Sequence, residues 1–247
     1  MKLLLQISYL GTDFHGFQVQ REKRTVQGEL CRAVSELFHT PLDVSGCSRT
    51  DSGVHAKVFF VTVDVKKSAP QIPPEAVKKG LNALLPSDIA INDAKIVSDD
   101  FHVRYSVKSK EYEYRILNRA VKDPFSADRA MHCQVPLDVD KMNEAARYFC
   151  GKHDFSSFMA SGSKIVDAVR TVFSSSVTKE KGDMVVFRVS ADGFLYNMVR
   201  IMVGTLLDVG TGKIAPEKIT EIINARSRNC AGVTAPPEGL YLIDVKY

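Results

Sequence analysis

The amino-acid sequence predicts an α+β fold with a largely antiparallel sheet. Stretches that alternate apolar and polar residues, as strands do, occur among stretches whose apolar residues recur at helical spacing. Two strand-like stretches, 171–178 and 184–190, flank a Glu-Lys-Gly-Asp turn and predict an antiparallel hairpin. The 247 residues, 45% hydrophobic and 25% charged, suit one large or two small packed domains and exclude collagen-like and disordered chains.

The first half alternates strand and helix. Residues 3–10 are expected to form a strand, and apolar residues at helical spacing predict a helix that begins after Thr25, its expected N-cap, and ends at Pro41. A strand is expected over 58–65, because one face of it carries a phenylalanine and three valines. A second helix is expected within 74–86, a stretch with a proline at each end.

The second half begins with a strand on which Tyr112, Tyr114 and Ile116 alternate along one face. A buried helix is expected over 196–209, because this segment is apolar on all sides and is closed by Gly210. The other expected elements are a helix over 139–150, the hairpin, a helix that begins at Pro216 and a closing strand over 240–245.

Composition limits the location and the partners of the chain. A net charge of +4 and a pI near 8.7 permit an anionic partner without requiring one. The first residues are typical of a strand and not of a signal peptide, and the most apolar segment, 198–207, is interrupted by Arg200, so no membrane span is expected. The five cysteines are scattered and form no C-x-x-C, which favours a reducing cytoplasm over a disulfide framework or a zinc site.

Residues 46–56 form the densest polar cluster, Gly-Cys-Ser-Arg-Thr-Asp-Ser-Gly-Val-His-Ala, between two expected strands. Gly53 allows a sharp turn, which would present the Asp51 carboxylate at the end of a sheet, where Arg49 and His55 can hold it. The alternative interpretation is a solvated Asx-turn, which is common where Asp and Gly lie close together.

Three other chemical interpretations of this loop are weaker. A triad of Ser48, Asp51 and His55 is disfavoured, because the members of such triads converge from separate elements. The Asp-Ser-Gly at 51–53 matches aspartic proteases, whose mechanism needs a second carboxylate, but the sequence holds no second Asp-Ser-Gly or Asp-Thr-Gly. Metal binding would need further ligands, and the other histidines are dispersed.

Arg200 is the only charged residue in the apolar segment 194–207. An unpaired guanidinium inside a buried helix is costly, so a carboxylate partner is expected from elsewhere in the fold, and Asp51 is a candidate. The alternative is that Arg200 extends along the helix end to reach solvent.

Aromatic and basic residues also interleave in this sequence. Tyr112 and Tyr114 lie on a strand that carries basic residues, and more basic residues precede the first helix. The two basic groups are Lys108, Lys110 and Arg115, and Arg21, Lys23 and Arg24. Such a combination suits stacking on unpaired bases with phosphates held alongside, whereas ordinary core packing is the alternative for the two tyrosines.

The loop that contains Asp51, Arg-Thr-Asp-Ser-Gly-Val-His-Ala, resembles the active-site motif of the TruA family of tRNA pseudouridine synthases. Three residues depart from the family pattern: Leu10, Phe17 and Ser52 stand where Asp, Trp and Ala are frequent, and they bear on substrate fit, not on the chemistry. The resemblance continues in order through the blocks at 14–20, 25–30, 100–104, 110–114, 151–155, 198–200 and 235–240.

The resemblance implies a pseudouridine synthase fold, with two similar halves around a central, largely antiparallel sheet flanked by helices. The N-terminal half, 1–105, would carry the catalytic loop, and the C-terminal half, 106–247, would complete a basic RNA-binding cleft. The implied reaction converts uridine to pseudouridine at positions 38, 39 and 40 in the anticodon stem-loop of tRNA. The implied enzyme is a cytoplasmic homodimer that needs no metal or cofactor and no membrane.

The resemblance also implies roles for single residues. Asp51 would be the catalytic carboxylate, either as a nucleophile at C1′ of the ribose or as a base at C2′. Tyr112 would stack on the flipped base, and Arg49 and Arg200 would keep Asp51 ionised and fill the space that the base leaves. The other residues expected to bind the substrate are Arg104 and Leu240.

Two other classes of function are weighed against this enzyme. A non-catalytic RNA-binding module of the same fold would not need a carboxylate at Asp51, which is present. A dimeric aspartic protease would need the carboxylate of a second subunit, and it would have no use for the basic residues.

Overall fold

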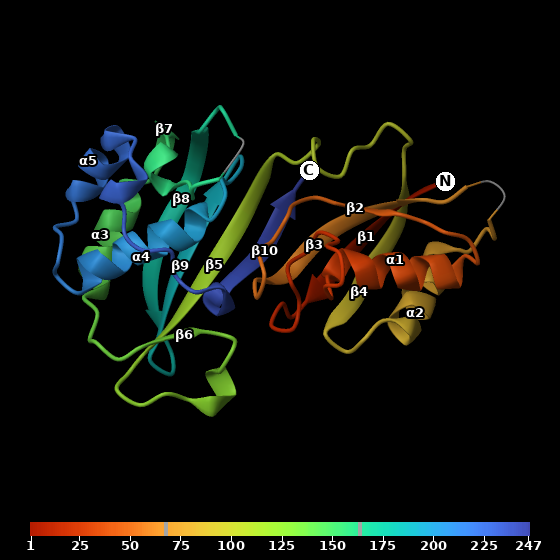
Figure 1. Ribbon diagram of the computed structural model, residues 1–247, viewed down its shortest axis with the longest axis horizontal. Helices are drawn as coiled ribbons and strands as arrows, with labels where there is room; N and C mark the ends of the chain where they lie inside the picture. The colour runs from red at the N-terminus through yellow and green to blue at the C-terminus, as the bar shows by residue number, and fades with distance from the viewer. Residues whose placement is uncertain (67–68, 163–164) are drawn as a thin grey trace. The chain divides into compact units, whose positions relative to one another are not determined.

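The computed structural model describes residues 1–66, 69–162 and 165–247, which form two compact units (Figure 1). Unit 1 comprises Met1–Lys108 and Tyr241–Tyr247, and unit 2 comprises Ser109–Leu240. The expected halves, 1–105 and 106–247, divide the chain three residues earlier and assign the last strand to the second half. In the structure this strand pairs with a strand of unit 1.

Unit 1 is a mixed sheet with two helices. Its strands lie in the order β4-β1-β3-β10. β2 pairs with the C-terminal end of β3, whereas β10 pairs with its N-terminal end. All of these pairings are antiparallel except that of β10 with β3. The elements are β1 (Lys2–Tyr9), α1 (Val26–Leu37), β2 (Val44–Gly46), β3 (His55–Asp64), α2 (Pro74–Leu84), β4 (Ile89–Val97) and β10 (Leu240–Lys246).

The core of unit 1 follows from alternation along its strands. Leu5 of β1 lies opposite Val61 of β3, and both side chains are buried. Burying the apolar face of each strand removes it from water, which is the main favourable term in folding. The Thr25 hydroxyl accepts a hydrogen bond from the backbone N–H of Gly28 at 3.2 Å, so the predicted N-cap of α1 is confirmed.

Unit 2 contains a largely antiparallel sheet and the helices α3, α4 and α5. Its strands lie in the order β5-β9-β8-β7, and β6 adds to β5 in parallel. The elements are β5 (Ser109–Asn118), β6 (Met131–Cys133), α3 (Val139–Arg147), β7 (Gly151–Asp154), β8 (Val169–Glu180), β9 (Met184–Ala191), α4 (Met198–Gly210) and α5 (Lys218–Ala225). The α+β class, the largely antiparallel sheet and the β8–β9 hairpin are confirmed.

The helix α4 is the most buried helix of unit 2, as its apolar sequence predicts. It begins at Met198, two residues later than expected, because Asn197 adopts a left-handed conformation with φ of 59° and starts the turn there. The helix α5 likewise begins at Lys218, two residues after Pro216. Among the residues that the structure describes, no helix combines the length and apolar character that crossing a membrane requires.

Candidate active site

The polar loop between β2 and β3 is held in place by hydrogen bonds to β1 and to the segment that follows it. The backbone N–H of Phe17 donates to the Thr50 carbonyl at 3.1 Å, and the N–H of Gly53 donates to the Phe14 carbonyl at 3.3 Å. The hydroxyls of Tyr9 and Thr50 share a buried hydrogen bond of 2.8 Å. These contacts flank Asp51 on both sides, so the backbone that carries its carboxylate is fixed.

Gly16 allows this supporting segment to approach the loop closely. Its φ is +81°, and a Cβ at this position would lie 2.7 Å from the Thr50 carbonyl oxygen and 3.3 Å from the carbonyl carbon of Asp51. A side chain here would therefore be strained twice, by the left-handed backbone and by the loop. Gly16 lies in the matching block 14–20, but no local pattern marks it as a contact of the loop.

Asp51 itself is half-buried in a tight turn. The backbone N–H of Val54 donates to the Asp51 carbonyl at 3.2 Å, and Gly53 adopts a φ of +79°. The predicted role of Gly53 as the residue that permits the turn is confirmed. A half-buried carboxylate on a fixed turn can meet a ligand while its direction stays defined.

The structure gives Arg49 and His55 partners that their sequence positions did not suggest. His55 is fully buried, its Nδ1 accepts the N–H of Gly11 at 2.9 Å, and its ring stacks on Tyr241 at 4.6 Å between centroids. Because Nδ1 accepts, a neutral ring carries its proton on Nε2. Arg49 is exposed, and its Nη1 lies 3.5 Å from the Gln18 Oε1. His55 thus joins the loop to β10, and its expected role in holding Asp51 stays a prediction.

In unit 2, Arg200 is half-buried and bonded to protein atoms, so it does not simply extend into solvent. Its Nε donates to the Ala235 carbonyl at 2.7 Å, and its Nη1 donates to the Asn197 Oδ1 at 2.8 Å. The N–H of Ala235 donates in return to the Arg200 carbonyl at 3.1 Å. The expected ion pair with Asp51 would join the two units and stays a prediction.

Residues 231–239, which we call the strap, run against α4. The Thr205 hydroxyl accepts the N–H of Gly232 at 3.0 Å, and a Cβ on Gly204 would collide with the backbone carbonyl of Val233. The absence of a side chain at Gly204 therefore lets the strap lie directly on the helix. Part of the strap lies in the matching block 235–240, but its contact with α4 could not be read from spacing, because Gly232 and Thr205 are 27 residues apart in the chain.

The remaining expected substrate-binding residues lie in different surroundings. Tyr112 on β5 is 7% exposed, and its ring meets Phe194 edge to face at 4.9 Å. Leu240 is buried at the start of β10, directly after the strap. Arg104 is exposed in unit 1. The structure thus places three of the six expected site residues in each unit: Arg49, Asp51 and Arg104 in unit 1, and Tyr112, Arg200 and Leu240 in unit 2.

The basic group before α1 divides into exposed and scaffold residues. Arg21 and Lys23 are exposed, whereas Arg24 binds both oxygens of Asp88 at 2.8 and 3.0 Å and lies 4.2 Å over the ring of Phe14. The hydrogen bonds to Asp88 raise the pKa of the Arg24 guanidinium. Arg24 therefore supports the segment that holds the polar loop, and its expected role as a phosphate contact stays a prediction.

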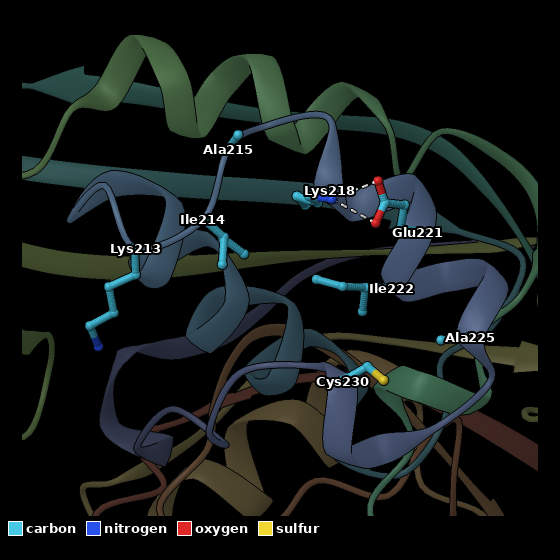
Figure 2. A pocket seen from close by; sticks show the side chains of 8 residues that line it. All are labelled: Lys213, Ile214, Ala215, Lys218, Glu221, Ile222, Ala225 and Cys230. Atoms are coloured by element: carbon cyan, nitrogen blue, oxygen red, sulfur yellow. Dashed lines mark hydrogen bonds and ion pairs between the residues drawn. The ribbon is translucent and has the colours of Figure 1, made fainter.

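A pocket of about 430 Å³ lies within unit 2, beside α5 (Figure 2). Lys218 donates to both carboxylate oxygens of Glu221 at 2.9 and 2.8 Å, and Lys213 donates to Asp208 at 2.9 Å. The lining comprises Lys213, Ile214, Ala215, Lys218, Glu221, Ile222, Ala225 and Cys230. Since both lysines have carboxylate partners, the pocket offers no surplus positive charge for a phosphate-rich ligand.

Comparison with known proteins decides the family. The family model described as tRNA pseudouridine synthase matches residues 6–106 and 145–247. The chain belongs to the tRNA pseudouridine synthase family. Its relatives named tRNA pseudouridine synthase A include one from Bacillus subtilis, 45% identical over 100% of this chain and 99% of that protein. Another, from Thermoanaerobacter sp., is 43% identical over 99% of each chain.

Among solved structures, a Cbf5-Nop10-Gar1 complex is similar with a TM-score of 0.36 at 14% identity, over 83% of this chain and 45% of that chain. The family model and the full-length relatives confirm the family resemblance of the sequence blocks. The tRNA pseudouridine synthases are isomerases that convert uridine to pseudouridine in tRNA. In the part of the chain that the structure describes, no three His, Cys, Asp or Glu side chains gather as a metal ion would require.

Proposed function

We propose that this chain converts uridine to pseudouridine at positions 38, 39 and 40 of the anticodon stem-loop of tRNA, with Asp51 as the catalytic carboxylate and without a cofactor. The observation that carries the proposal is the fixed, half-buried Asp51 turn in a chain whose relatives are tRNA pseudouridine synthases over their full length. Because the reaction involves no redox step, a preorganised carboxylate can promote it without a cofactor.

The reaction breaks the N-glycosidic bond of one uridine and forms a C–C bond between C1′ of the same ribose and C5 of the base. A carboxylate can serve as a nucleophile at C1′ or as a base at C2′, and both routes need it ionised and positioned at the sugar. The proton on C5 leaves after the new bond forms, and N1, which has lost its bond to C1′, takes up a proton. One proton is lost and one is gained, so the product is an isomer of the substrate.

We assign the other expected site residues to substrate binding. Arg49 and Arg200 would favour the anionic form of Asp51, because a nearby guanidinium stabilises a carboxylate. Tyr112, which is 7% exposed, would stack on the flipped base. The residues proposed to contact the RNA beside them are Arg104 and Leu240.

We also propose that the enzyme acts in the cytoplasm as a homodimer, with one tRNA bridging both subunits. Light scattering coupled to size-exclusion chromatography of the free enzyme measures its mass. A monomeric mass across micromolar concentrations would contradict this part of the proposal.

The decisive experiment is incubation of the enzyme with unmodified tRNA transcripts that carry uridine at 38, 39 or 40, followed by chemical mapping of pseudouridine. We expect new pseudouridine at these positions and none in transcripts in which the three uridines are replaced by cytidine. Modification confined to another region of tRNA would overturn the assignment of the site.

A further inference from the structure

Tyr114 of β5 is a buried tyrosine to which the proposed reaction assigns no role. It is 0% exposed, and its hydroxyl donates to the Pro236 carbonyl at 2.8 Å across 122 residues of sequence. Burial raises the pKa of Tyr114 far above its ordinary value, the charge of Glu238 raises it further, and the charge of Arg200 opposes this. The hydroxyl therefore stays protonated and donates at every working pH.

The ring of Tyr114 also seats the far end of the strap. A Cβ on Gly239 would lie 2.7 Å from both Cε1 and Cζ of the Tyr114 ring. The strap thus touches Tyr114 twice, through a hydrogen bond at Pro236 and through packing at Gly239. Between these two contacts the chain forms the short 3-10 turn Pro237–Gly239, after which Leu240 begins β10.

The strap connects Tyr114 to the guanidinium of Arg200. Pro236, which accepts the Tyr114 hydroxyl, follows Ala235, which accepts the Arg200 Nε at 2.7 Å and donates its own N–H to the Arg200 carbonyl at 3.1 Å. Any movement of the strap at Pro236 therefore moves the acceptor on which the Arg200 side chain rests. All of these residues lie in unit 2.

We propose that Tyr114 is a positioning residue whose hydroxyl fixes the strap and, through Ala235, the guanidinium of Arg200. This inference rests on the proposed function, in which Arg200 acts at the catalytic carboxylate. Tyr114 does not touch the substrate in this role. Its contribution is to hold Arg200 in one orientation, which matters because misplaced catalytic groups lose much of their effect.

The test is Tyr114→Phe, which keeps the buried ring and removes only the donor. The Pro236 carbonyl then loses its partner, so we expect a single-turnover rate about three- to tenfold lower at saturating tRNA, with the dissociation constant for tRNA changed less than about twofold. Tyr247→Phe is the matched control, because the Tyr247 hydroxyl also donates to a backbone carbonyl, that of Val103, at 2.8 Å. It should leave the saturating rate unchanged.

A double-mutant cycle with Arg200→Met separates positioning from general loosening of the fold. If Tyr114 acts through Arg200, Tyr114→Phe should lower the rate by less than about twofold once the guanidinium is gone. An unchanged rate in the single variant, or a full and additive loss in the double variant, would overturn the proposal.

Hydrogen exchange supplies a readout that does not depend on activity. Tyr114→Phe should accelerate exchange of the Ala235 amide by about three- to tenfold, and Tyr247→Phe should leave it unchanged. Unchanged exchange at Ala235 in Tyr114→Phe would overturn the proposal even if the rate falls. If the wild-type enzyme forms no pseudouridine, the proposed function fails, and the exchange data still decide whether Tyr114 fixes the strap.

Discussion

The two units hold their proposed site residues by different means. In unit 1 the Asp51 turn shares backbone hydrogen bonds with Phe14, which accepts, and Phe17, which donates. In unit 2 the Arg200 guanidinium rests on a strap that is tied by side chains, among them Thr205 and Tyr114. Backbone bonds survive most substitutions, whereas a bond made by a side chain is lost with that side chain. The site in unit 2 should therefore be easier to disturb by conservative changes.

The largest expected effect is on the carboxylate itself. Asp51→Asn keeps the shape of the side chain and the turn beneath it but removes the charge, so we expect a loss of at least about 1,000-fold in single-turnover rate. Binding of tRNA should change less than about twofold, because phosphate contacts elsewhere supply most of the affinity. Pseudouridine mapping and filter binding measure the two quantities.

Asp13→Asn is the matched control for this variant, since Asp13 is exposed on the supporting segment and the substitution changes the same charge. It should keep the wild-type rate. An Asp51→Asn enzyme that still turns over would remove Asp51 from the chemistry.

The second prediction tests how unit 1 supports its loop. Gly16→Ala should destabilise the protein by about 2 to 3 kcal/mol, because the new methyl meets the Thr50 carbonyl in addition to the left-handed strain. Gly212→Ala has a similar φ, +76°, and open space around it, so it should cost only about 1 kcal/mol. Urea denaturation measures both; equal values would mean that the close approach does not hold the loop.

The third prediction concerns the charge in unit 2. Arg200→Met keeps much of the apolar length of the side chain and should fold, but the rate should fall by about 10- to 100-fold. A guanidinium beside Asp51 would lower the pKa of that carboxyl, so its removal should raise this pKa and move the acid limb of the pH–rate profile to higher pH.

The measurement is the single-turnover rate against pH, with thermal melts to verify folding. Arg32→Met, on the exposed face of α1, should leave the profile in place. An unshifted profile with full activity for Arg200→Met would show that the ion pair with Asp51 does not form.

The smallest expected effect is on RNA affinity. Replacing Arg21 and Lys23 together by glutamine should reduce the slope of log affinity against log salt by about 1.4 to 1.8, if each contacts one phosphate. Lys79→Gln, at an exposed position of α2, should leave the slope unchanged. A slope that is unaffected by the double variant would place the phosphate contacts on other residues.

Patterning in the sequence predicted most elements because strand and helix periodicity are local properties. The Thr25 cap, the proline-bounded α2 and the β8–β9 hairpin depend on residues within a few positions of one another, and all are confirmed. The Gly53 turn is local too, and it was predicted for the same reason. The family could be recognised because several of its sequence blocks occur in the expected order along this chain.

Only the tertiary structure decided which side chains have partners. The partner of Arg24 is Asp88, 64 residues away, and the acceptor for the Tyr114 hydroxyl lies 122 residues away, so neither could be read from spacing. His55 was expected beside Asp51 from the loop alone, and only the fold shows that it is also buried and accepts the N–H of Gly11. A sequence determines which groups can bond locally, whereas folding brings distant segments together and selects among the possible partners, because buried polar groups must be satisfied wherever the chain places them.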